Sequence, residues 1–556
     1  MSKTDSSKLA DKIYRGQYCM NHRIEGPFGE RLITFADYIG SGQSLQFVEE
    51  YIQQNILPTY ANTHTEVSFT GKQTGHYREE ARQLIKKSVN ANADDALIFC
   101  GSGSTSAINK IVSQFQGDLP LKPLVFLGPY EHHSNVLPWR ESGIEIVSVP
   151  ITPLGLIDVV YLEEKLKQYQ NSRLMIGSFS AASNVTGIIS LIDEITVLLH
   201  RYNALSFWDY AAGAAYMNVN MNSEGLAYKD AIFISPHKVM GGPGTPGILL
   251  VKRKVFRRAT PTQPGGGTVQ FVTKTQQKYY KDIEVREEAG TPGIIESIRA
   301  GLIFKLKDAV GTSYIHKKET EYITRALDKF KKNKNILILG NTDAPRLGFM
   351  AFLIKCENRF LHHNFVVALL NDLFGIQARG GCSCAGPYGH DLLEISEARS
   401  QAHIDELETG NMGTKPGWVR LNFNYFIPES EFQFIVDAID WISKNGWKLL
   451  KKYEFDDRNA LWRVPERPIS VNSLDSFLGS KPIVKPKSKN KRAEECKMYL
   501  LEADKIAQIA LNAWSEKPLQ EYYFPQLQNN LRWYALADDL KIKELRNEGI
   551  KEWQTH

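Results

Sequence analysis

The sequence predicts an α/β fold in which a mostly parallel seven-stranded sheet lies between helices. A smaller α+β domain and a helical C-terminal extension follow. Three observations predict this: seven short apolar runs, helical stretches between several of them, and a change of pattern near residue 298. Runs of Val, Ile, Leu and Phe without polar alternation are typical of parallel strands covered on both faces. A chain of 556 residues has room for two or three domains.

The seven predicted strands lie within residues 31–297, which we expect to form the large domain. Helical stretches such as EEARQLIKKSV separate several strands, and repeated strand–helix–strand units are typical of an α/β domain. The strands are predicted at residues 96–100, 123–127, 144–149, 174–180, 204–209, 231–235 and 247–251.

The remaining segments have other patterns. Residues 1–30 are polar and are expected to form an N-terminal leader, and residues 298–450 alternate long helices with strands, as in a small α+β domain. Residues 451–492 end in a basic, proline-containing stretch, which predicts a solvated linker. Residues 493–556 are predicted to be helical.

Composition excludes several classes of protein. Hydrophobic residues make up 42% of the chain and charged residues 23%, so it is not collagen-like, mainly disordered or a small disulfide scaffold. A net charge of +5 over this length does not favour nucleic acid or a membrane as partner. Six cysteines indicate reduced thiols, and we find no apolar signal segment or bilayer-length apolar run. We therefore expect a cytoplasmic protein.

The segment SPHKVMGGPGTPGILLV, residues 235–251, is the most informative for chemistry. It places Lys238 directly after a predicted buried strand and before several glycines. A lysine in the crevice at the C-terminal edge of a parallel sheet can lose its hydration. Its pKa then falls, and the amine becomes nucleophilic enough to form a Schiff base. The plainer alternative is a surface lysine in a glycine-rich turn.

A carboxylate ends the predicted strand that precedes the one leading to Lys238. Asp209 is separated from Lys238 by enough chain for one crossover to an adjacent strand. A pyridoxal phosphate site needs such a carboxylate, because it keeps the pyridine nitrogen protonated and lets the ring accept carbanion charge. Taken alone, Asp209 would more often be a helix cap or a turn residue.

A loop of small residues offers a place for a phosphate. CGSGSTSAINKIV, residues 100–112, follows the first predicted strand of the sheet and opens a helix. Backbone N–H groups and the hydroxyls of Ser104 and Thr105 can approach an anion at this positive helix end. The loop lacks the G-x-G-x-x-G spacing of a dinucleotide site. The interpretation of this loop as a phosphate site is strengthened by the presence of Lys238 and Asp209.

Two histidines follow another predicted strand, in EHHSNVLPW, residues 131–139. One of them could stack on an aromatic cofactor and take part in proton transfer. The usual alternative is a turn histidine with its hydrogen bonds satisfied. Adjacent histidines also suggest a metal site, but no further ligands at metal-site spacing complete one. We therefore expect no metal.

In motif order, these segments resemble the class V aminotransferase superfamily of fold-type I pyridoxal phosphate enzymes. Within it they are most similar to the cysteine desulfurase and selenocysteine lyase group. The resemblance extends from about residue 31 to residue 450. It implies pyridoxal 5'-phosphate as cofactor and a homodimer with sites at the interface. The motifs that carry it are GSTSAIN, EHHSNVLPW, SNVTG, FWDYAAGA, SPHK, AGTPG, IQARGGCSCAGPYGH and WVRLNFNYF.

The resemblance implies a role for each matching residue. Lys238 would be the catalytic Schiff-base lysine, Asp209 would face the ring nitrogen, and His132 would stack on the cofactor and serve in catalysis. Asn184, in SNVTG, would contact cofactor and substrate. The other implied cofactor-binding residues are Ser104, Thr105, Ser235, His237 and Thr291, the last reaching the phosphate of the neighbouring subunit.

The segment IQARGGCSCAGPYGH separates a desulfurase from a plain aminotransferase in this group. In the family an arginine is followed five positions later by the catalytic cysteine, and here Arg379 is followed by Cys384 at that spacing. A mobile glycine-rich loop beside an arginine could expose and activate the thiolate. Cys382 could be a second sulfur acceptor, a redox partner, part of a metal site, or incidental.

The late segment WVRLNFNYF implies that Arg420 holds the substrate carboxylate with a forked pair of hydrogen bonds, with Arg379 also binding substrate. Three departures from the family stand out. Ala212 occupies the position of a glutamine that hydrogen-bonds the cofactor phenolate. FADYIGSGQSL replaces an LDNAATT-like segment, and a charged insertion, including ISEARSQAHIDELETG, precedes Arg420.

These observations predict a pyridoxal phosphate-dependent cysteine desulfurase. It would remove sulfur from L-cysteine to give alanine and an enzyme persulfide on Cys384, from which an acceptor protein could receive the sulfur. One alternative is a class V aminotransferase, epimerase or lyase acting on another amino acid, with Cys384 structural. The other is a non-catalytic binding protein whose C-terminal extension recruits a partner.

Overall fold

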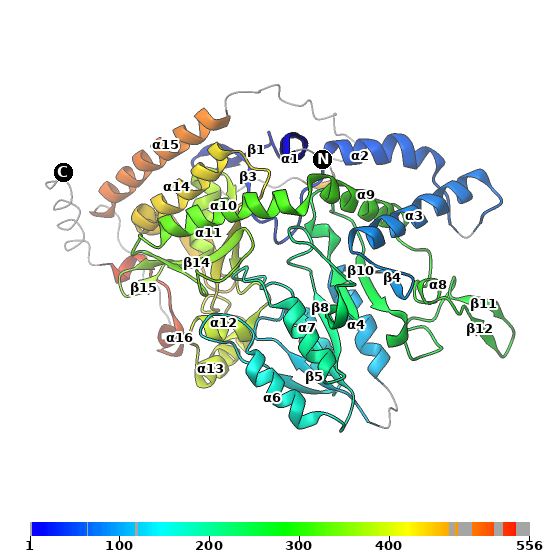
Figure 1. The fold of residues 1–556 in the computed structure, drawn as a ribbon. Coiled ribbons are helices and arrows are strands. Elements are labelled where there is room, and N and C mark those ends of the chain that lie inside the picture. The colour runs from blue at the N-terminus through cyan, green and yellow to red at the C-terminus, as the bar shows by residue number, and fades with distance from the viewer. Residues whose placement is uncertain are drawn as a thin grey trace.

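The computed structural model describes residues 3–63, 65–116, 121–465, 473–475, 492–515 and 526–540. Its centre is a seven-stranded sheet in the order β4-β10-β9-β8-β7-β5-β6 (Figure 1). β10 runs antiparallel to both its neighbours, and the other pairings are parallel. The strands are β4 (Asp95–Cys100), β5 (Leu124–Leu127), β6 (Glu145–Ser148), β7 (Met175–Ser180), β8 (Leu205–Asp209), β9 (Ala231–Ile234) and β10 (Gly247–Lys252).

All seven predicted strands of the large domain are confirmed within one or two residues at their ends. β4, β5, β7, β9 and β10 are buried along their whole length. Such strands must be covered on both faces, which explains why their sequences are apolar without alternation.

Helices cover the two faces of this sheet and form two apolar layers. One layer packs on Ile98, Val125 and Phe207, and the other on Leu97, Phe126 and Trp208. The first face carries α4 (Gly103–Val112), α5 (Leu137–Glu141) and α8 (Ile283–Arg286). The second face carries α3 (Phe69–Ser88), α6 (Val159–Tyr169), α7 (Ile192–Arg201) and α9 (Ile294–Val310).

A smaller α+β unit follows α9, as the sequence predicts. Its sheet has the order β13-β14-β18-β17, with β15 paired to β14. The strands are β13 (Ile336–Ile338), β14 (Phe349–Cys356), β15 (Arg359–Phe360), β17 (Arg379–Gly381) and β18 (Trp418–Asn422). The helices are α10 (Thr312–Phe330), α11 (His363–Phe374), α12 (Gly386–Leu392), α13 (Glu397–Glu408) and α14 (Glu429–Asn445). α12 begins within the segment that carries Cys384, and α13 belongs to the charged insertion that follows it.

The N-terminal segment folds onto both parts of the molecule. The expected leader, residues 1–30, forms α1 (Lys3–Arg15) and β1 (Arg23–Gly26) and begins β2 (Gly29–Leu32), and α1 packs on α9. β3 (Thr34–Phe35) then pairs in parallel with β16 (Ile376–Gln377), more than three hundred residues later in the chain. α2 (Gln46–Tyr51) follows β3 and leads to a π turn at Ile52–Ile56.

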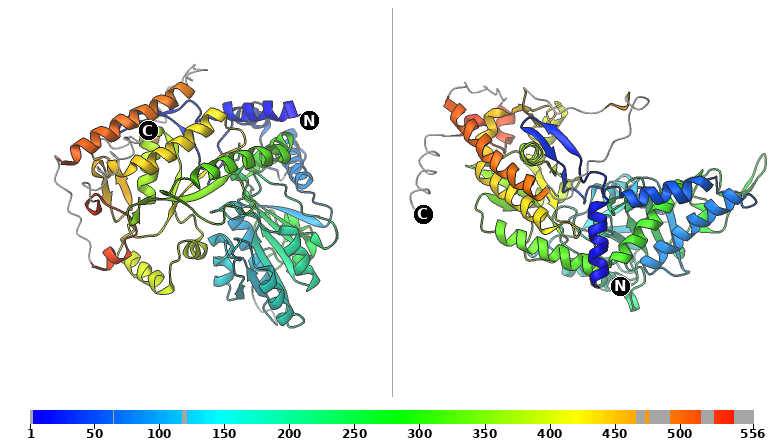
Figure 2. Two further views of the ribbon diagram at one scale, coloured as in Figure 1. Left: turned by 60° about the vertical axis from the view of Figure 1, so that its left-hand side comes forward. Right: turned by 90° about the horizontal axis from the view of Figure 1, so that it is seen from above.

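The C-terminal part differs from the expected linker and extension. Residues 454–463 form a hairpin of β19 (Glu454–Asp456) and β20 (Leu461–Arg463), because the large apolar side chains Tyr453, Phe455 and Trp462 are buried there. α15 (Arg492–Asn512) packs on α14, and α16 (Gln526–Leu531) packs on α13 (Figure 2). Residues 466–472, 476–491, 516–525 and 541–556 of these predictions lie outside the described residues.

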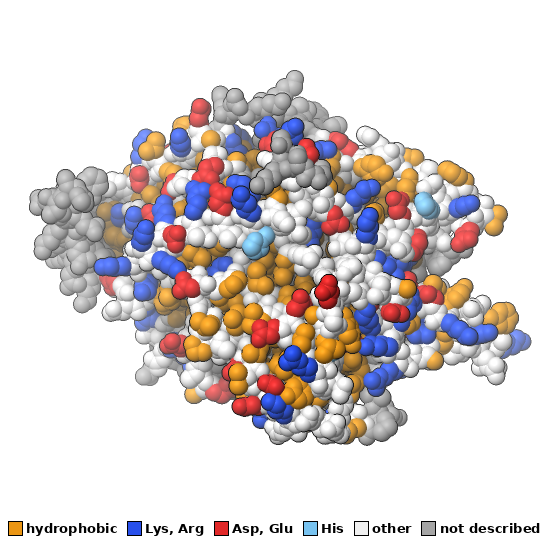
Figure 3. Space-filling view, in the orientation of Figure 1, with side chains coloured by type: hydrophobic (Ala, Val, Ile, Leu, Met, Phe, Trp, Pro, Cys, Tyr) orange, Lys and Arg blue, Asp and Glu red, His pale blue; other side chains and the backbone are white. Residues whose placement is uncertain are grey.

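Two projections carry exposed apolar side chains on one side of the large domain (Figure 3). One is the chain between α2 and α3, where Val67 is 99% and Phe69 is 70% exposed. The other is the hairpin of β11 (Val269–Val272) and β12 (Gln277–Tyr279), where Phe271 is 68% exposed. Among the described helices, none is long and apolar enough to span a membrane.

Candidate active site

A cavity of about 410 Å³ opens at the C-terminal edge of the large sheet, and residues of the smaller unit complete its wall. Every site residue predicted from the sequence, except Thr291, lines this cavity. These residues are Ser104, Thr105, His132, Asn184, Asp209, Ser235, His237, Lys238, Arg379, Cys384 and Arg420. Ala212, at the position of the family glutamine, also lines it.

Lys238 lies on a short turn that begins where the apolar strand β9 ends. Pro236, His237 and Lys238 form one turn of 3₁₀-helix. Burial, and secondarily the positive charge of Arg420, lower the pKa of the Lys238 amine to about 8. The neutral amine, which is the form that attacks a carbonyl carbon, is therefore a minority near physiological pH but far more abundant than for an ordinary lysine.

Asp209 ends the neighbouring strand β8 and is buried in the wall of the same cavity. β8 runs parallel to β9, with Asp209 opposite Phe233. The Ala211 N–H donates a hydrogen bond of 2.8 Å to Oδ1 of Asp209. Burial raises the pKa of this carboxyl group, so a cationic partner in the cavity would stabilise its ionised form.

The first turn of α4 forms a tightly packed cradle for an anion. The Ser104 N–H donates to Ser235 Oγ at 2.8 Å, which ties the helix start to the end of β9. Gly103 has a φ of +55°, and a Cβ on Gly247 would lie 1.9 Å from the Gly103 carbonyl oxygen. The close approach requires glycine at position 247, and the positive φ favours it at position 103. The cradle places backbone N–H groups and the Thr105 hydroxyl at the positive end of α4.

His132 is held as a neutral ring at the cavity wall. Its Nδ1 accepts a hydrogen bond of 3.1 Å from the Ser134 N–H, so the neutral ring carries its proton on Nε2. Burial, followed by the charges of Lys238 and His133, lowers the pKa of His132 to about 4. A neutral imidazole suits stacking on an aromatic ring.

Arg379 and Arg420 are opposite each other on the paired strands β17 and β18. Asp37 bridges them: Arg420 donates to its Oδ1 at 3.1 Å and the Nε of Arg379 donates to its Oδ2 at 2.9 Å. A second Arg420 nitrogen donates to the Asn184 carbonyl oxygen at 2.9 Å. The Nε of Arg420 is buried and has no partner among the described residues, so it can receive a carboxylate.

Asp37 is a site residue that the sequence analysis missed. It lies in FADYIGSGQSL, a segment that departs from the family pattern. A Cβ on Gly40 would lie 2.5 Å from Oδ2 of Asp37, so a side chain there would push the carboxylate out of place. The Gly42 N–H donates to the His237 carbonyl oxygen at 2.8 Å, which joins this segment to the lysine turn.

The loop that carries Cys384 is fastened on both sides of the cysteine. Nδ2 of Asn184 donates to the Ser383 carbonyl oxygen at 2.7 Å, and the His133 N–H donates to the Cys384 carbonyl oxygen at 2.9 Å. The Gly386 N–H donates to Nε2 of His133 at 3.0 Å. Cys384 is exposed in the cavity mouth, whereas Cys382 is half-buried and packs against the core.

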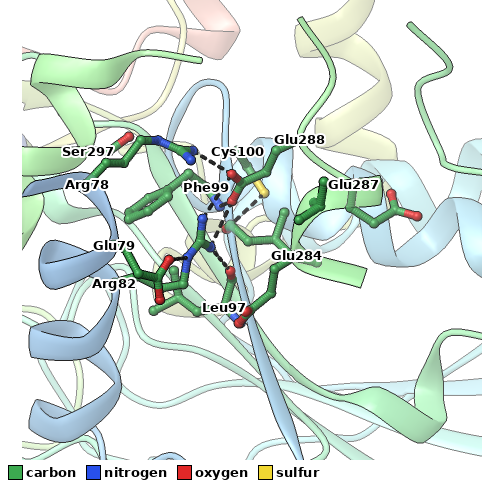
Figure 4. A network of polar contacts seen from close by, with 12 residues as sticks. Arg78, Glu79, Arg82, Leu97, Phe99, Cys100, Glu284, Glu287, Glu288 and Ser297 are labelled. Atoms are coloured by element: carbon green, nitrogen blue, oxygen red, sulfur yellow. Dashed lines mark hydrogen bonds and ion pairs between the residues drawn. The ribbon is translucent and has the colours of Figure 1, made fainter. Parts of the chain in front are cut away.

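Thr291 lies outside the cavity, after a segment fixed by a buried ion-pair network (Figure 4). Arg78 and Arg82 of α3 pair with Glu288, which also accepts from the Phe99 N–H at 2.7 Å. Burial raises the pKa of Glu288, but the two arginines outweigh it and lower the pKa below its ordinary value. In the described part of the chain, no group of three or more His, Cys, Asp or Glu side chains could hold a metal ion.

Comparison with known proteins identifies the family to which this fold belongs. Residues 34–402 match the family model described as Aminotransferase class-V. The chain belongs to the class-V aminotransferase family. This result confirms the family predicted from the motifs, together with its fold-type I architecture and its dependence on pyridoxal phosphate.

The alignments with individual relatives cover most of each relative's length. A probable cysteine desulfurase of Halalkalibacterium halodurans is 28% identical over 377 residues, covering 67% of this chain and 89% of that protein. One from Staphylococcus aureus is 27% identical over 382 residues, covering 68% and 88%. The solved apo structure of a cysteine desulfurase from Thermococcus onnurineus superposes with a TM-score of 0.62 at 22% identity, covering 74% and 95%. This likeness shows a shared fold.

The residues present fit pyridoxal phosphate. The α4 cradle offers N–H groups and a hydroxyl to the phosphate, Asp209 offers a carboxylate to the ring nitrogen, and Lys238 offers the amine. Oδ1 of Asn184 is buried, lines the same cavity wall, and has no partner among the described residues. Such an unsatisfied acceptor is costly unless a ligand donates to it.

Proposed function

We propose that this chain is a pyridoxal phosphate-dependent cysteine desulfurase that converts L-cysteine to alanine and a persulfide on Cys384. The observation that carries the proposal is that Cys384 and Lys238 share one cavity with the arginine pair. A plain aminotransferase does not need an exposed thiol there. The relatives described as cysteine desulfurases support the same activity.

The arginines would bind and orient the substrate. Arg420 presents its unpartnered Nε, and Arg379 lies beside it. The substrate carboxylate could bind between the two arginines, with the substrate α-amino group directed to Lys238. Asp37 keeps the two guanidinium groups together. Binding of the substrate carboxylate by the two arginines would fix which face of the substrate is directed to Lys238.

Lys238 would move the proton at the substrate α-carbon. Its lowered pKa allows the amine to accept this proton and later return it. When bound, pyridoxal phosphate supplies an electron sink for the carbanion formed at that carbon. Asp209 would hold the ring nitrogen protonated, and the neutral ring of His132 would cover one face.

Cys384 would then take the sulfur. Its thiolate attacks the substrate sulfur, a sulfur–sulfur bond forms, and the carbon–sulfur bond of the substrate breaks. The substrate carbon keeps the electron pair of the broken bond and takes up a proton, which gives alanine. The exposed position of Cys384 leaves its persulfide accessible to a sulfur-acceptor protein.

We further propose a homodimer in the cytoplasm. The exposed apolar side chains of Val67, Phe69 and Phe271 support an interface on this side of the large domain. Thr291 lies near the same side, where Nδ2 of Asn62 donates to its Oγ1 at 3.4 Å. It would reach the phosphate of a second copy. All six cysteines are free thiols, which is consistent with a reducing compartment.

Two single-cysteine variants test the proposed activity. We expect Cys384→Ser to lose cysteine-dependent sulfide and alanine formation while it still binds pyridoxal phosphate, and Cys382→Ser to keep both. Unchanged sulfide formation by Cys384→Ser would move the nucleophile elsewhere. Cysteine consumption only when a keto acid is added, with formation of the amino acid that corresponds to that keto acid, would instead indicate an aminotransferase.

A further inference from the structure

The two adjacent histidines of EHHSN are held with opposite ring protonation. Nδ1 of His132 accepts a hydrogen bond, whereas in His133 it is Nε2 that accepts, from the Gly386 N–H at 3.0 Å. His133 in its neutral form therefore carries its proton on Nδ1. His132 faces the cavity and His133 contacts the cysteine loop, so the two adjacent histidines connect the cavity wall to this loop.

The conformation of the cysteine loop needs such contacts. Ser383 and Cys384 have φ values of +53° and +56°, two consecutive non-glycine residues in the left-handed region. This conformation costs about 1 kcal/mol or more per residue for L-amino acids. Surrounding bonds must therefore hold it. His133 supplies two of the three hydrogen bonds described above, one from its backbone and one to its ring.

We propose that His133 is a positioning residue, whose ring holds the loop so that Cys384 stands over the substrate sulfur. The inference rests on the proposed desulfurase activity. His133 does not touch the reacting atoms. It acts through Gly386, which lies two residues after the cysteine and begins α12. Without the ring acceptor, only the bonds from Asn184 and from the His133 N–H hold Ser383 and Cys384 in the left-handed conformation.

The substitution His133→Leu removes the acceptor, and His133→Gln replaces it with an amide oxygen at similar reach. Loss of one such hydrogen bond corresponds to about a tenfold change in an equilibrium. We expect His133→Leu to lower kcat for sulfide formation about tenfold with little change in KM, because the arginines that bind the carboxylate are untouched. His133→Gln should recover most of that loss.

Amide hydrogen exchange provides a readout that does not depend on turnover. In His133→Leu the Gly386 amide loses its acceptor, and we expect it to exchange about tenfold faster than in the unmodified chain. His390→Leu is the matched control, because His390 is exposed on α12 and contacts Ser400 (3.1 Å), outside this set of bonds. It should leave exchange at Gly386 unchanged.

The results separate this inference from the proposed function. If His133→Leu has the same kcat and the same Gly386 exchange rate as the unmodified chain, the role of His133 is overturned. An equal loss of kcat in His133→Leu and His133→Gln would also overturn it. If the unmodified chain releases no sulfide from cysteine, the proposed activity fails. The exchange experiment would then still decide whether His133 holds the loop.

Discussion

Arg379 and Arg420 face each other directly across β17 and β18, and one carboxylate, that of Asp37, contacts both. Like charges at directly opposed positions of an antiparallel pair destabilise a sheet. The Asp37 carboxylate neutralises one of the two charges. What remains is one net positive charge, which matches the single carboxylate of a simple amino acid.

Replacing Asp37 by asparagine should therefore destabilise the cofactor-free protein. Arg420 is 3% exposed, so it cannot compensate for the lost carboxylate by hydration. We expect a melting temperature lower by about 2–4 °C, with little recovery at high salt because the site is buried. Asp343→Asn is the matched control, since Asp343 is 83% exposed where it pairs with Lys331. Equal melting temperatures for Asp37→Asn and the unmodified protein would show that Asp37 does not stabilise the arginine pair.

The pH dependence of cofactor uptake should follow the pKa of Lys238. The neutral amine is the reactive form, and burial lowers its pKa to about 8. We expect the rate of pyridoxal phosphate uptake to rise with pH through about 8 and then level off, as measured by absorbance. Arg420→Met removes a charge that lowers this pKa, so its midpoint should move upward. A midpoint near the ordinary lysine value in both proteins would contradict this.

Gly247→Ala should weaken cofactor binding. The new Cβ would lie 1.9 Å from the Gly103 carbonyl oxygen, which forces the start of α4 to move. Because the phosphate would bind at that helix start, we expect a dissociation constant about tenfold higher. Gly266→Ala is the control, since a Cβ there meets nothing within 4 Å. Equal dissociation constants for the two variants would argue against the phosphate cradle.

Asp209→Asn should separate cofactor binding from catalysis. The amide fits the same space but supplies no charge to a protonated ring nitrogen. We expect kcat for alanine formation to fall about a hundredfold at equal cofactor occupancy. The variant should also lower the pKa of Lys238, because the Asp209 charge raises it. Retained kcat would place the partner of the ring nitrogen elsewhere.

The fold was largely predictable because its signals are local. Most strands of the large sheet are mainly apolar and buried, and Asp209 ends one of them while Lys238 follows another. The chain around residues 451–465 was misjudged. The basic composition farther along suggested a linker, while Phe455 and Trp462 are spaced for packing and are buried.

The site was less predictable where it depends on contacts between distant segments. The motifs identified Arg379, Arg420 and Cys384, but no local pattern marks Asp37, which reaches both arginines from more than three hundred residues away. For His133 the sequence suggests only a metal or a stacking role. Its contact with Gly386 arises from the fold, since these residues meet only when the large and small units pack together.

The pairing of β3 with β16 has a consequence for biosynthesis. Asp37 emerges from the ribosome early, but Arg379 and Arg420 are among the last parts of the site to be made. β3 therefore stays without its strand partner while more than three hundred further residues are made. Such a long-range pairing is expected to form late and to slow the completion of the site during folding.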